Sequence, residues 1–413
     1  MASSLPNNPS LDRLKADARR LQRGITTGDR DAVDLVRRCH PKPSIALAES
    51  PSRFALHDAQ LTIARSYGFT GWPALVHYLR IAADFTVDPH AVDEDTLDPA
   101  DRFCALSALR YDDDDAPPRW QTAADLLAAD PMLVDRHVWA AAAASDPAAL
   151  RRHLAADPTL ARRAGGPFGW APLLHLTYSR APLGRSQDEA LEAAAVLLDA
   201  GADPNAGYLW CGMSTPFTAL TGAFGEGEQG PRRQPRHPYD QALAALLLDR
   251  GAHPEDQQTL YNRMFRPGDD HLELLFAHGL GRVEPGPWHR RLGEAMETQE
   301  QMWARQVGWA AEHGFADRLV LLGEHGVDVS GVKVVEQSLP EDPNELDAEG
   351  STALHHAAWA GDLYRMRVLL DAGADPSITD GRFGSTPLGW AEHAYQSEAA
   401  DLLRGARNVG HDG

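Results

Sequence analysis

Histidines are the side chains of this 413-residue chain that could do chemistry most directly. Two of them, His355 and His356, are adjacent, and carboxylates lie near several others in the sequence. An imidazole beside a carboxylate can act as a general acid or base, so a groove holding such groups against an apolar substrate could catalyse proton transfer. The histidines that could face such a groove are His175, His313, His356 and His393.

The sequence lacks patterns that usually accompany catalysis. Neither G-x-S-x-G nor H-E-x-x-H is present, and no phosphate loop of the form G-x-x-x-x-G-K-[ST] occurs. Adjacent helical residues point about 100° apart, so the histidine pair is a poor metal site. The cysteines, Cys39, Cys104 and Cys211, are far apart, which argues against a disulfide framework and a structural zinc site. We therefore predict no catalytic residue, no metal and no cofactor, with acid-base catalysis as the alternative.

The stretch from Ser351 to Asp380 predicts the elements that position the two histidines. Its apolar residues mark one face of a first helix and, after a break at Gly361, one face of a second helix. Gly373 and Pro376 then end the second helix. The apolar positions are Leu354, Ala357 and Ala358, followed by Met366, Leu369 and Leu370. One such unit cannot bury its own apolar face, so other units are expected to stack against it.

Parts of this unit recur along the chain. Its Leu-Leu-Asp-x-Gly-Ala-x-Pro ending appears at residues 197–204 and 247–254, and a Ser-Thr-Pro start appears at residues 214–216 and 385–387. Weaker copies stand at residues 274–279, 310–314 and 321–328. These pieces resemble the ankyrin repeat, in which T-P-L-H-x-A-A, a glycine-bounded turn and L-L-x-x-G-A-D-x-N recur about every 33 residues. The resemblance is specific because several separate pieces recur in the same order.

The resemblance implies an all-α solenoid of helix-turn-helix units with short hairpin turns. It also implies that His355 hydrogen-bonds across the hairpin and the helix start, and that His356 packs between neighbouring repeats. A solenoid has no single core to outgrow, so the length of the chain counts repeats rather than domains.

The chain is expected to divide into four parts. Residues 1–80 form an N-terminal helical block that caps the solenoid, and residues 81–118 form an acidic, exposed connection with a short helix. Residues 119–164 are degenerate repeats, and residues 165–413 are clearer repeats with insertions at 181–188, 222–239, 281–301 and 331–345.

Two polar segments need a separate interpretation. The four carboxylates at residues 112–115 lack the spacing of a calcium loop, and we predict a solvated loop there. The insertion at 222–239 is rich in glycine and proline. We predict that it lines a groove together with the insertion at 181–188, or that it is a disordered surface loop.

Composition limits the partners. The net charge of −20 disfavours nucleic acid, because phosphate contacts need a concentrated basic surface. No apolar run approaches the roughly 18 residues of a membrane span, and the first residues do not form a secretory signal. Lysine occurs only at positions 15, 42 and 333, so arginine supplies nearly all cationic groups, which is typical of a GC-rich bacterial genome. We expect a cytoplasmic bacterial protein of undetermined oligomeric state.

The resemblance also indicates which side chains bind. In ankyrin arrays the hairpin tips and the residues after the first helix line a concave groove. Here these places carry large aromatic residues, histidine and arginine, where polar turn residues are usual, and such side chains dominate binding hot spots. We predict that these residues capture a protein partner. An apolar small molecule is the alternative ligand. The alternative structure is that the aromatic side chains fold back on the insertions. The predicted binding residues are Phe168, Trp170, Tyr178, Tyr208, Trp210, His313, Trp359, Arg382, Phe383 and His393.

Overall fold

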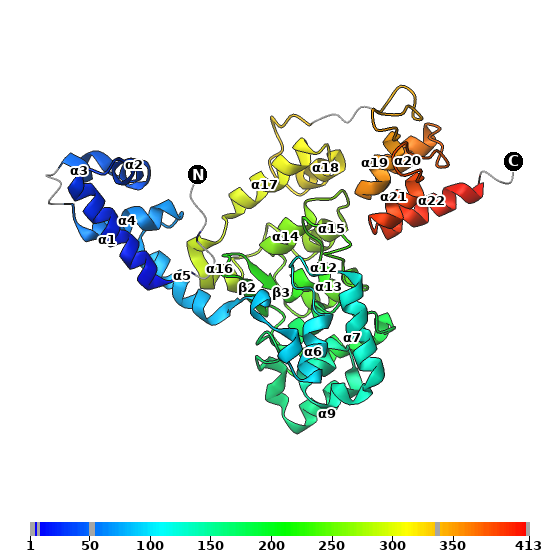
Figure 1. Cartoon of the computed structure of the whole chain (residues 1–413), viewed down its shortest axis with the longest axis horizontal. Coiled ribbons are helices and arrows are strands. Elements are labelled where there is room, and N and C mark those ends of the chain that lie inside the picture. The colour runs from blue at the N-terminus through cyan, green and yellow to red at the C-terminus, as the bar shows by residue number, and fades with distance from the viewer. Residues whose placement is uncertain (1–4, 6–8, 49–53, 335–338, 410–413) are drawn as a thin grey trace.

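The structure is a computed structural model that describes residues 5, 9–48, 54–334 and 339–409. Figure 1 shows a helical block at the N-terminal end, a central body of stacked helices and a smaller group of helices at the C-terminal end. None of the helices in these ranges combines the length and the apolarity that crossing a membrane requires.

The N-terminal block attaches to the central body through its last helix. Its core includes Trp288 and Leu292, which belong to a helix far along the chain, α16 (Pro287–Leu292). The Trp288 ring meets the Phe85 ring edge-on at 5.2 Å, and Arg291 stacks on both rings. The helices of the block are α1 (Leu11–Thr27), α2 (Arg30–Cys39), α3 (Pro43–Ala48), α4 (Leu56–Ser66) and α5 (Trp72–Phe85).

The central body consists of helix pairs whose members form two rows. The first helices contact one another in sequence order, and so do the second helices from α9 to α15, as expected for a stack of repeats. The first helices are α6 (Pro99–Ser107), α8 (Val138–Ala143), α10 (Pro172–Thr177), α12 (Ala219–Phe224), α14 (Gln257–Arg263) and α17 (Gln299–Glu312). The second helices are α7 (Pro117–Ala129), α9 (Pro147–Ala156), α11 (Gln187–Asp199), α13 (Asp240–Asp249), α15 (Asp270–Ala277) and α18 (Ala316–Glu324). One continuous hydrophobic core runs through the stack from Ala100 to Leu322.

Short 3-10 turns connect some of these elements. They are η2 (Pro89–Ala91), η3 (Glu94–Thr96), η4 (Pro131–Asp135), η5 (Pro158–Arg162) and η6 (Gly293–Ala295).

The C-terminal repeats form a separate unit with a core of their own. They comprise α19 (Ala353–Ala360), α20 (Leu363–Asp371), α21 (Pro387–His393) and α22 (Ser397–Val409). The predicted helix break is confirmed, because Gly361 ends α19 in the left-handed conformation with φ of 70°. The all-α repeat solenoid is therefore confirmed, whereas the division of the chain at residues 80, 118 and 164 stays a prediction.

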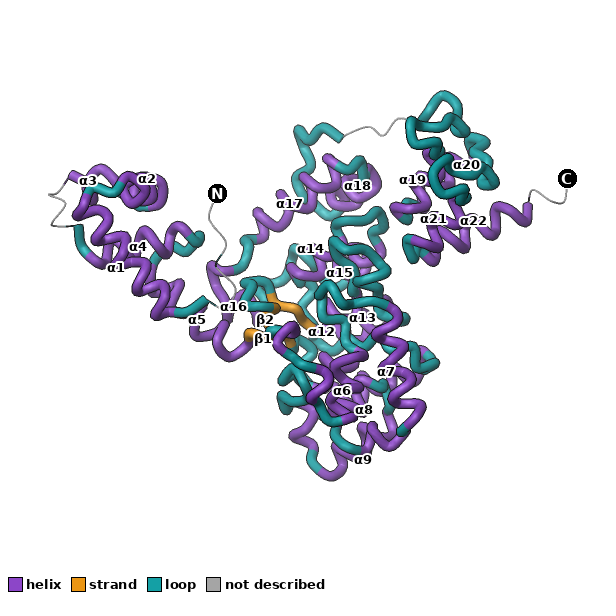
Figure 2. The backbone as a smooth tube through the Cα atoms, viewed as in Figure 1, coloured by secondary structure: helices purple, strands orange, loops and turns teal. Residues whose placement is uncertain are grey.

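A small sheet was not predicted from the sequence. Strand β2 (Gly207–Trp210) pairs with β3 (Pro216–Thr218) in an antiparallel hairpin and with β1 (Thr86–Val87) in parallel, as the orange segments of Figure 2 show. The hairpin is the tip of one repeat, and β1 belongs to the connection that was expected to be exposed. Period-2 alternation gives little signal in strands this short.

The prediction of a solvated loop at residues 112–115 is wrong for Asp112 and Asp115, which are both buried. The Asp115 carboxylate accepts hydrogen bonds from the backbone N–H groups of Arg110 and Tyr111 at 2.9 and 2.7 Å, and Arg119 lies 3.3 Å away. A buried carboxylate is tolerated when donors surround it in this way. The acidic run is therefore part of the structural framework.

The insertion at 222–239 is ordered, so the alternative of a disordered loop is wrong. Its backbone carbonyls at Gly222 and Pro235 accept hydrogen bonds from the buried guanidinium of Arg180, at 2.6 and 2.9 Å. Gly225, Gly227 and Gly230 also have the spacing G-x-G-x-x-G. They follow helix α12 rather than a strand, so they lack the context of a dinucleotide-binding loop.

Candidate functional site

Four predicted binding residues do not face solvent. Phe168, Trp170, Tyr178 and Tyr208 are at most 5% exposed. Their rings pack together, with Trp170 stacked on Tyr208 at 4.7 Å, and the Tyr178 hydroxyl donates to the Thr218 carbonyl at 2.9 Å. Their assignment to an open groove is wrong, because the tips fold back onto neighbouring repeats and bury these rings.

Trp210 also has a structural role. It is half-buried, its indole N–H donates to the Arg110 carbonyl at 2.8 Å, and its ring meets the His90 ring edge-on at 5.7 Å. It therefore joins strand β2 to the segment that precedes α7.

The remaining predicted binding residues are accessible. Trp359 is 50% exposed and stacks on the exposed His393 of the next repeat, with ring centroids 5.9 Å apart. Phe383 is 67% exposed at a hairpin tip, with the Arg382 guanidinium 4.9 Å above its ring. His313 is half-buried at the end of α17.

The histidines of the catalytic alternative do not meet at one centre. His175 is buried, its Nε2 donates to the Gly165 carbonyl at 3.2 Å, and burial lowers its pKa to about 4. Nε2 of His356 lies 2.6 Å from the Asp347 carboxylate, and His393 stacks on Trp359. His313 and His356 do lie on the same groove, which the structure places between the central body and the C-terminal repeats.

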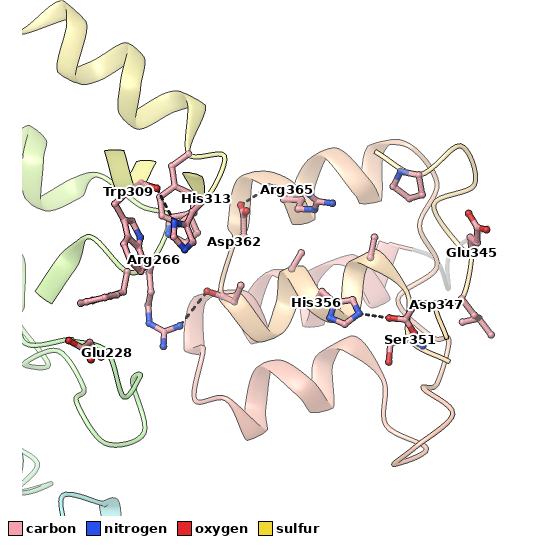
Figure 3. Close-up of a pocket in the computed structure, with 18 residues that line it drawn as sticks. Glu228, Arg266, Trp309, His313, Glu345, Asp347, Ser351, His356, Asp362 and Arg365 are labelled. Carbon is pink, nitrogen blue, oxygen red and sulfur yellow. Dashed lines mark hydrogen bonds and ion pairs between the residues drawn. The ribbon is translucent and has the colours of Figure 1, made fainter. Parts of the chain in front are cut away.

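This groove has a volume of about 930 Å³ and lies where the row of first helices is interrupted. Helix α17 forms one wall and α19 the other (Figure 3). In the C-terminal repeats, by contrast, α19 packs directly against α21. The faces that would meet in an uninterrupted stack therefore remain partly open between α17 and α19.

One wall carries rings from a run of contacting aromatic side chains, the aromatic ladder, which consists of Tyr261, Phe265, Trp309, His313 and Phe315. Phe265 meets Trp309 edge-on at 4.9 Å, and Trp309 stacks on His313 at 3.9 Å with an interplanar angle of 13°. Trp309 and His313 are one turn apart on α17, which places them on one face. Guanidinium groups already stack on both end rings, with Arg305 over Tyr261 at 5.2 Å and Arg318 over Phe315 at 5.0 Å.

The opposite wall combines small side chains with carboxylates. Ala353, Ala357 and Ala360 leave room along α19, and carboxylates stand along the rim. The backbone N–H of Ser351 and then the His356 ring hold the pKa of Asp347 below its usual range. The carboxylates that line the groove are Glu228, Glu345, Asp347 and Asp362, against the two guanidinium groups of Arg266 and Arg365. Arg266 reaches from the first wall to the Ala360 carbonyl at 3.5 Å, as Figure 3 shows.

Comparison with known proteins identifies one of the repeats. The family model of the ankyrin repeat matches residues 349–381, which contain α19 and α20. These residues form an ankyrin repeat. Among solved structures, the crystal structure of EF0377, an ankyrin repeat protein, is similar at 20% sequence identity and a TM-score of 0.22, over 65% of this chain and 97% of that chain. A TM-score this low supports no statement about shared shape. No curated protein matches the chain.

Most of the aromatic ladder was not predicted from the sequence. Trp309 could have been found, because it stands directly before Ala310-Ala311 as His356 stands before Ala357-Ala358. Phe265 follows α14 in a segment without a recognisable repeat pattern, so it gave no signal. Only the packing of α14 against α17 brings Phe265 to Trp309.

Proposed function

We propose that this ankyrin-repeat protein binds a protein partner and that the groove between α17 and α19 takes a basic segment of that partner. Ankyrin repeats are interaction modules, and stacked repeats offer extended, largely preformed surfaces. The observation that carries the proposal is that aromatic rings of the ladder and four carboxylates line the same groove. A cytoplasmic setting fits the three free thiols of Cys39, Cys104 and Cys211.

The aromatic ladder suits cationic side chains. An arginine or lysine over a tryptophan ring gains about 0.5–2 kcal/mol, depending on how far it is desolvated. The ladder already stacks Arg305 and Arg318 on its end rings, so its geometry admits such contacts. The middle rings, Phe265 and Trp309, line the groove.

The charges around the groove favour the same partner. Four carboxylates and two guanidinium groups line the groove, so negative charge is in excess there. Glu228 and Glu345 are exposed, so their attraction for a cationic segment is screened by salt but acts during approach. The chain as a whole, at −20, attracts a basic partner and repels an acidic one.

The test compares two short peptides by titration calorimetry on the full chain. One is rich in arginine and contains tryptophan, and in the other glutamate replaces the arginines. We expect the basic peptide alone to bind, and its affinity to fall with salt. Trp309→Ala should weaken binding by about tenfold or more, and Glu345→Lys by several-fold. Two controls have exposed side chains that do not line the groove, Tyr364→Ala and Glu300→Lys, and both should leave the affinity within about twofold.

Equal binding of both peptides, or full affinity in Trp309→Ala, would refute the proposal. Salt-independent binding of an apolar small molecule that is lost in Trp309→Ala would point instead to a carrier or enzyme.

A further inference from the structure

Two chain segments that are distant in sequence end side by side at one edge of the small sheet. Strands β1 and β2 are parallel, with Val87 opposite Trp210. The next residues are Asp88 and Cys211, and the Cys211 backbone N–H donates to the Val87 carbonyl at 2.8 Å. His90 follows within the turn η2. The parallel pairing therefore delivers a carboxylate, an imidazole and a thiol to the same edge.

The ligand atoms of these three side chains lie close together. One ligand atom from each of Asp88, His90 and Cys211 lies within 4.8 Å of the other two. The Cys211 sulfur is 3.7 Å from Oδ1 of Asp88. A tetrahedral zinc ion holds its ligand atoms roughly 3.3–3.8 Å apart. Side-chain rotations that move the ligand atoms by about 1 Å would therefore bring them to the distances that zinc requires.

The backbone around the three groups is held in place. Cys211 has φ of 48°, a left-handed conformation that a residue with a side chain adopts only when its surroundings impose it. The Tyr78 hydroxyl of α5 donates to the next carbonyl, that of Gly212, at 2.7 Å. The Asp88 carboxylate accepts from the His90 backbone N–H at 3.1 Å, and the Trp210 ring supports the His90 ring. These contacts fix the backbone on both sides of the cluster, and the Cys211 sulfur lies beside the Asp88 carboxylate.

We propose that Asp88, His90 and Cys211 bind a divalent transition-metal ion of the zinc type. Thiolate, imidazole and carboxylate are the ligands that zinc uses, and three protein ligands leave a fourth position for water or a donor from a partner. Binding would displace the thiol proton into solution. The ion would also join the connection that follows the N-terminal block, which supplies Asp88 and His90, to the central body, which supplies Cys211.

A second cluster of similar composition, Asp98, Asp101 and His137, is explained without a metal. Nδ1 of His137 accepts from the Ala140 backbone N–H at 3.0 Å, so the neutral ring carries its proton on Nε2. That nitrogen lies 3.2 Å from the Asp101 carboxylate. Its lone pair is therefore not available to a cation, unlike the nitrogens of His90, which is exposed.

The test is titration of the metal-free full chain with Zn²⁺ against a chromophoric chelator, and with Co²⁺ followed by absorption. We expect one tight site per chain, a thiolate-to-cobalt charge-transfer band, release of a proton and a higher Tm. Cys211→Ser and His90→Ala should each weaken the site by at least about 100-fold, because each removes one of three ligands. Cys39→Ser is the control, since Cys39 is a free cysteine of the N-terminal helices outside the cluster, and it should change nothing.

His90→Ala removes an exposed side chain, so it tests the site even if Cys211→Ser disturbs folding. Absence of micromolar binding, absence of the thiolate band, or unchanged binding in His90→Ala would overturn the proposal.

Discussion

His355 and His356 are adjacent in the sequence, but their surroundings differ. His355 is buried, and its Nδ1 accepts from the Thr352 backbone N–H at 3.1 Å, so its proton lies on Nε2, which donates to the Ser385 carbonyl at 3.0 Å. This confirms the structural role that the ankyrin resemblance implied. His356 is exposed and pairs with Asp347 at the groove. Both rings meet Trp390 of the next repeat edge-on, at 5.3 and 5.6 Å, but successive helical side chains point about 100° apart, so only His355 is buried.

At the residue scale, we predict that His355→Ala destabilises the C-terminal repeats by about 1–3 kcal/mol, because it leaves the buried Thr352 backbone N–H unpaired and removes a hydrogen bond to the Ser385 carbonyl. Faster amide hydrogen exchange in α19 to α22 would measure this loss. Burial lowers the pKa of His355, so its contribution is complete above about pH 6.5, the pKa of an unfolded histidine, and declines as the pH falls below it.

His356→Ala is the matched control for this substitution. Because the His356 ring is exposed, its removal should leave the exchange pattern almost unchanged. Equal effects of the two substitutions would show that the hydrogen bonds of His355 do not hold the repeat.

At the scale of elements, close helix packing depends on one glycine. A Cβ atom at Gly222 in α12 would lie 2.4 Å from the Tyr178 ring and 2.7 Å from the Thr177 hydroxyl. Both neighbours are buried, so they have little room to move. Gly222 therefore allows α12 to approach α10, and the start of the insertion is fixed by packing rather than by local propensity.

We predict that Gly222→Ala lowers the free energy of unfolding, although alanine is the better helix former by about 1 kcal/mol. The clash should cost about 1–3 kcal/mol and outweigh that gain. The control is Gly308→Ala in α17, where a Cβ atom meets nothing within 4 Å, and it should be neutral or stabilising. Urea denaturation of both variants checks the pair, and a stabilised Gly222→Ala variant would contradict the packing argument.

At the scale of the whole molecule, the described residues bury their hydrophobic side chains in three separate cores. The C-terminal core is built mainly from alanines with a few larger residues such as Leu369, whereas the central core runs through the whole stack. A groove rather than a packed interface separates α17 from α19. Cooperativity in a solenoid comes from contacts between neighbouring repeats, so the interruption uncouples the two units.

We predict that the C-terminal repeats unfold in a transition of their own, at lower denaturant than the central body. Leu369→Ala should shift only the first transition and Leu150→Ala only the second, each by about 2–5 kcal/mol, because both leucines are fully buried in their cores. Hydrogen exchange during denaturation would resolve the two units. A single transition that both substitutions shift would show that the groove does not uncouple them.

The sequence by itself determined the helix pairs and their ends. The signals were helix periodicity, the glycine at position 361 and the repeated Leu-Leu-Asp-x-Gly-Ala segments. Each signal reflects interactions between residues a few positions apart, and the same interactions form the helices and their ends in the structure. The role of His355 was predictable for the same reason, since Thr352 is one turn away and Ser385 recurs at the matching point of the next repeat.

Only the tertiary structure decided which aromatic and polar residues are accessible. The burial of Trp170 and Tyr208, the groove beside Trp309 and the meeting of Asp88 with Cys211 all join segments that are distant along the chain. Their positions depend on how the insertions fold back and on where the stack is interrupted. Long-range packing of this kind leaves no period in the sequence, because each contact is made by unrelated segments rather than by the repeating unit.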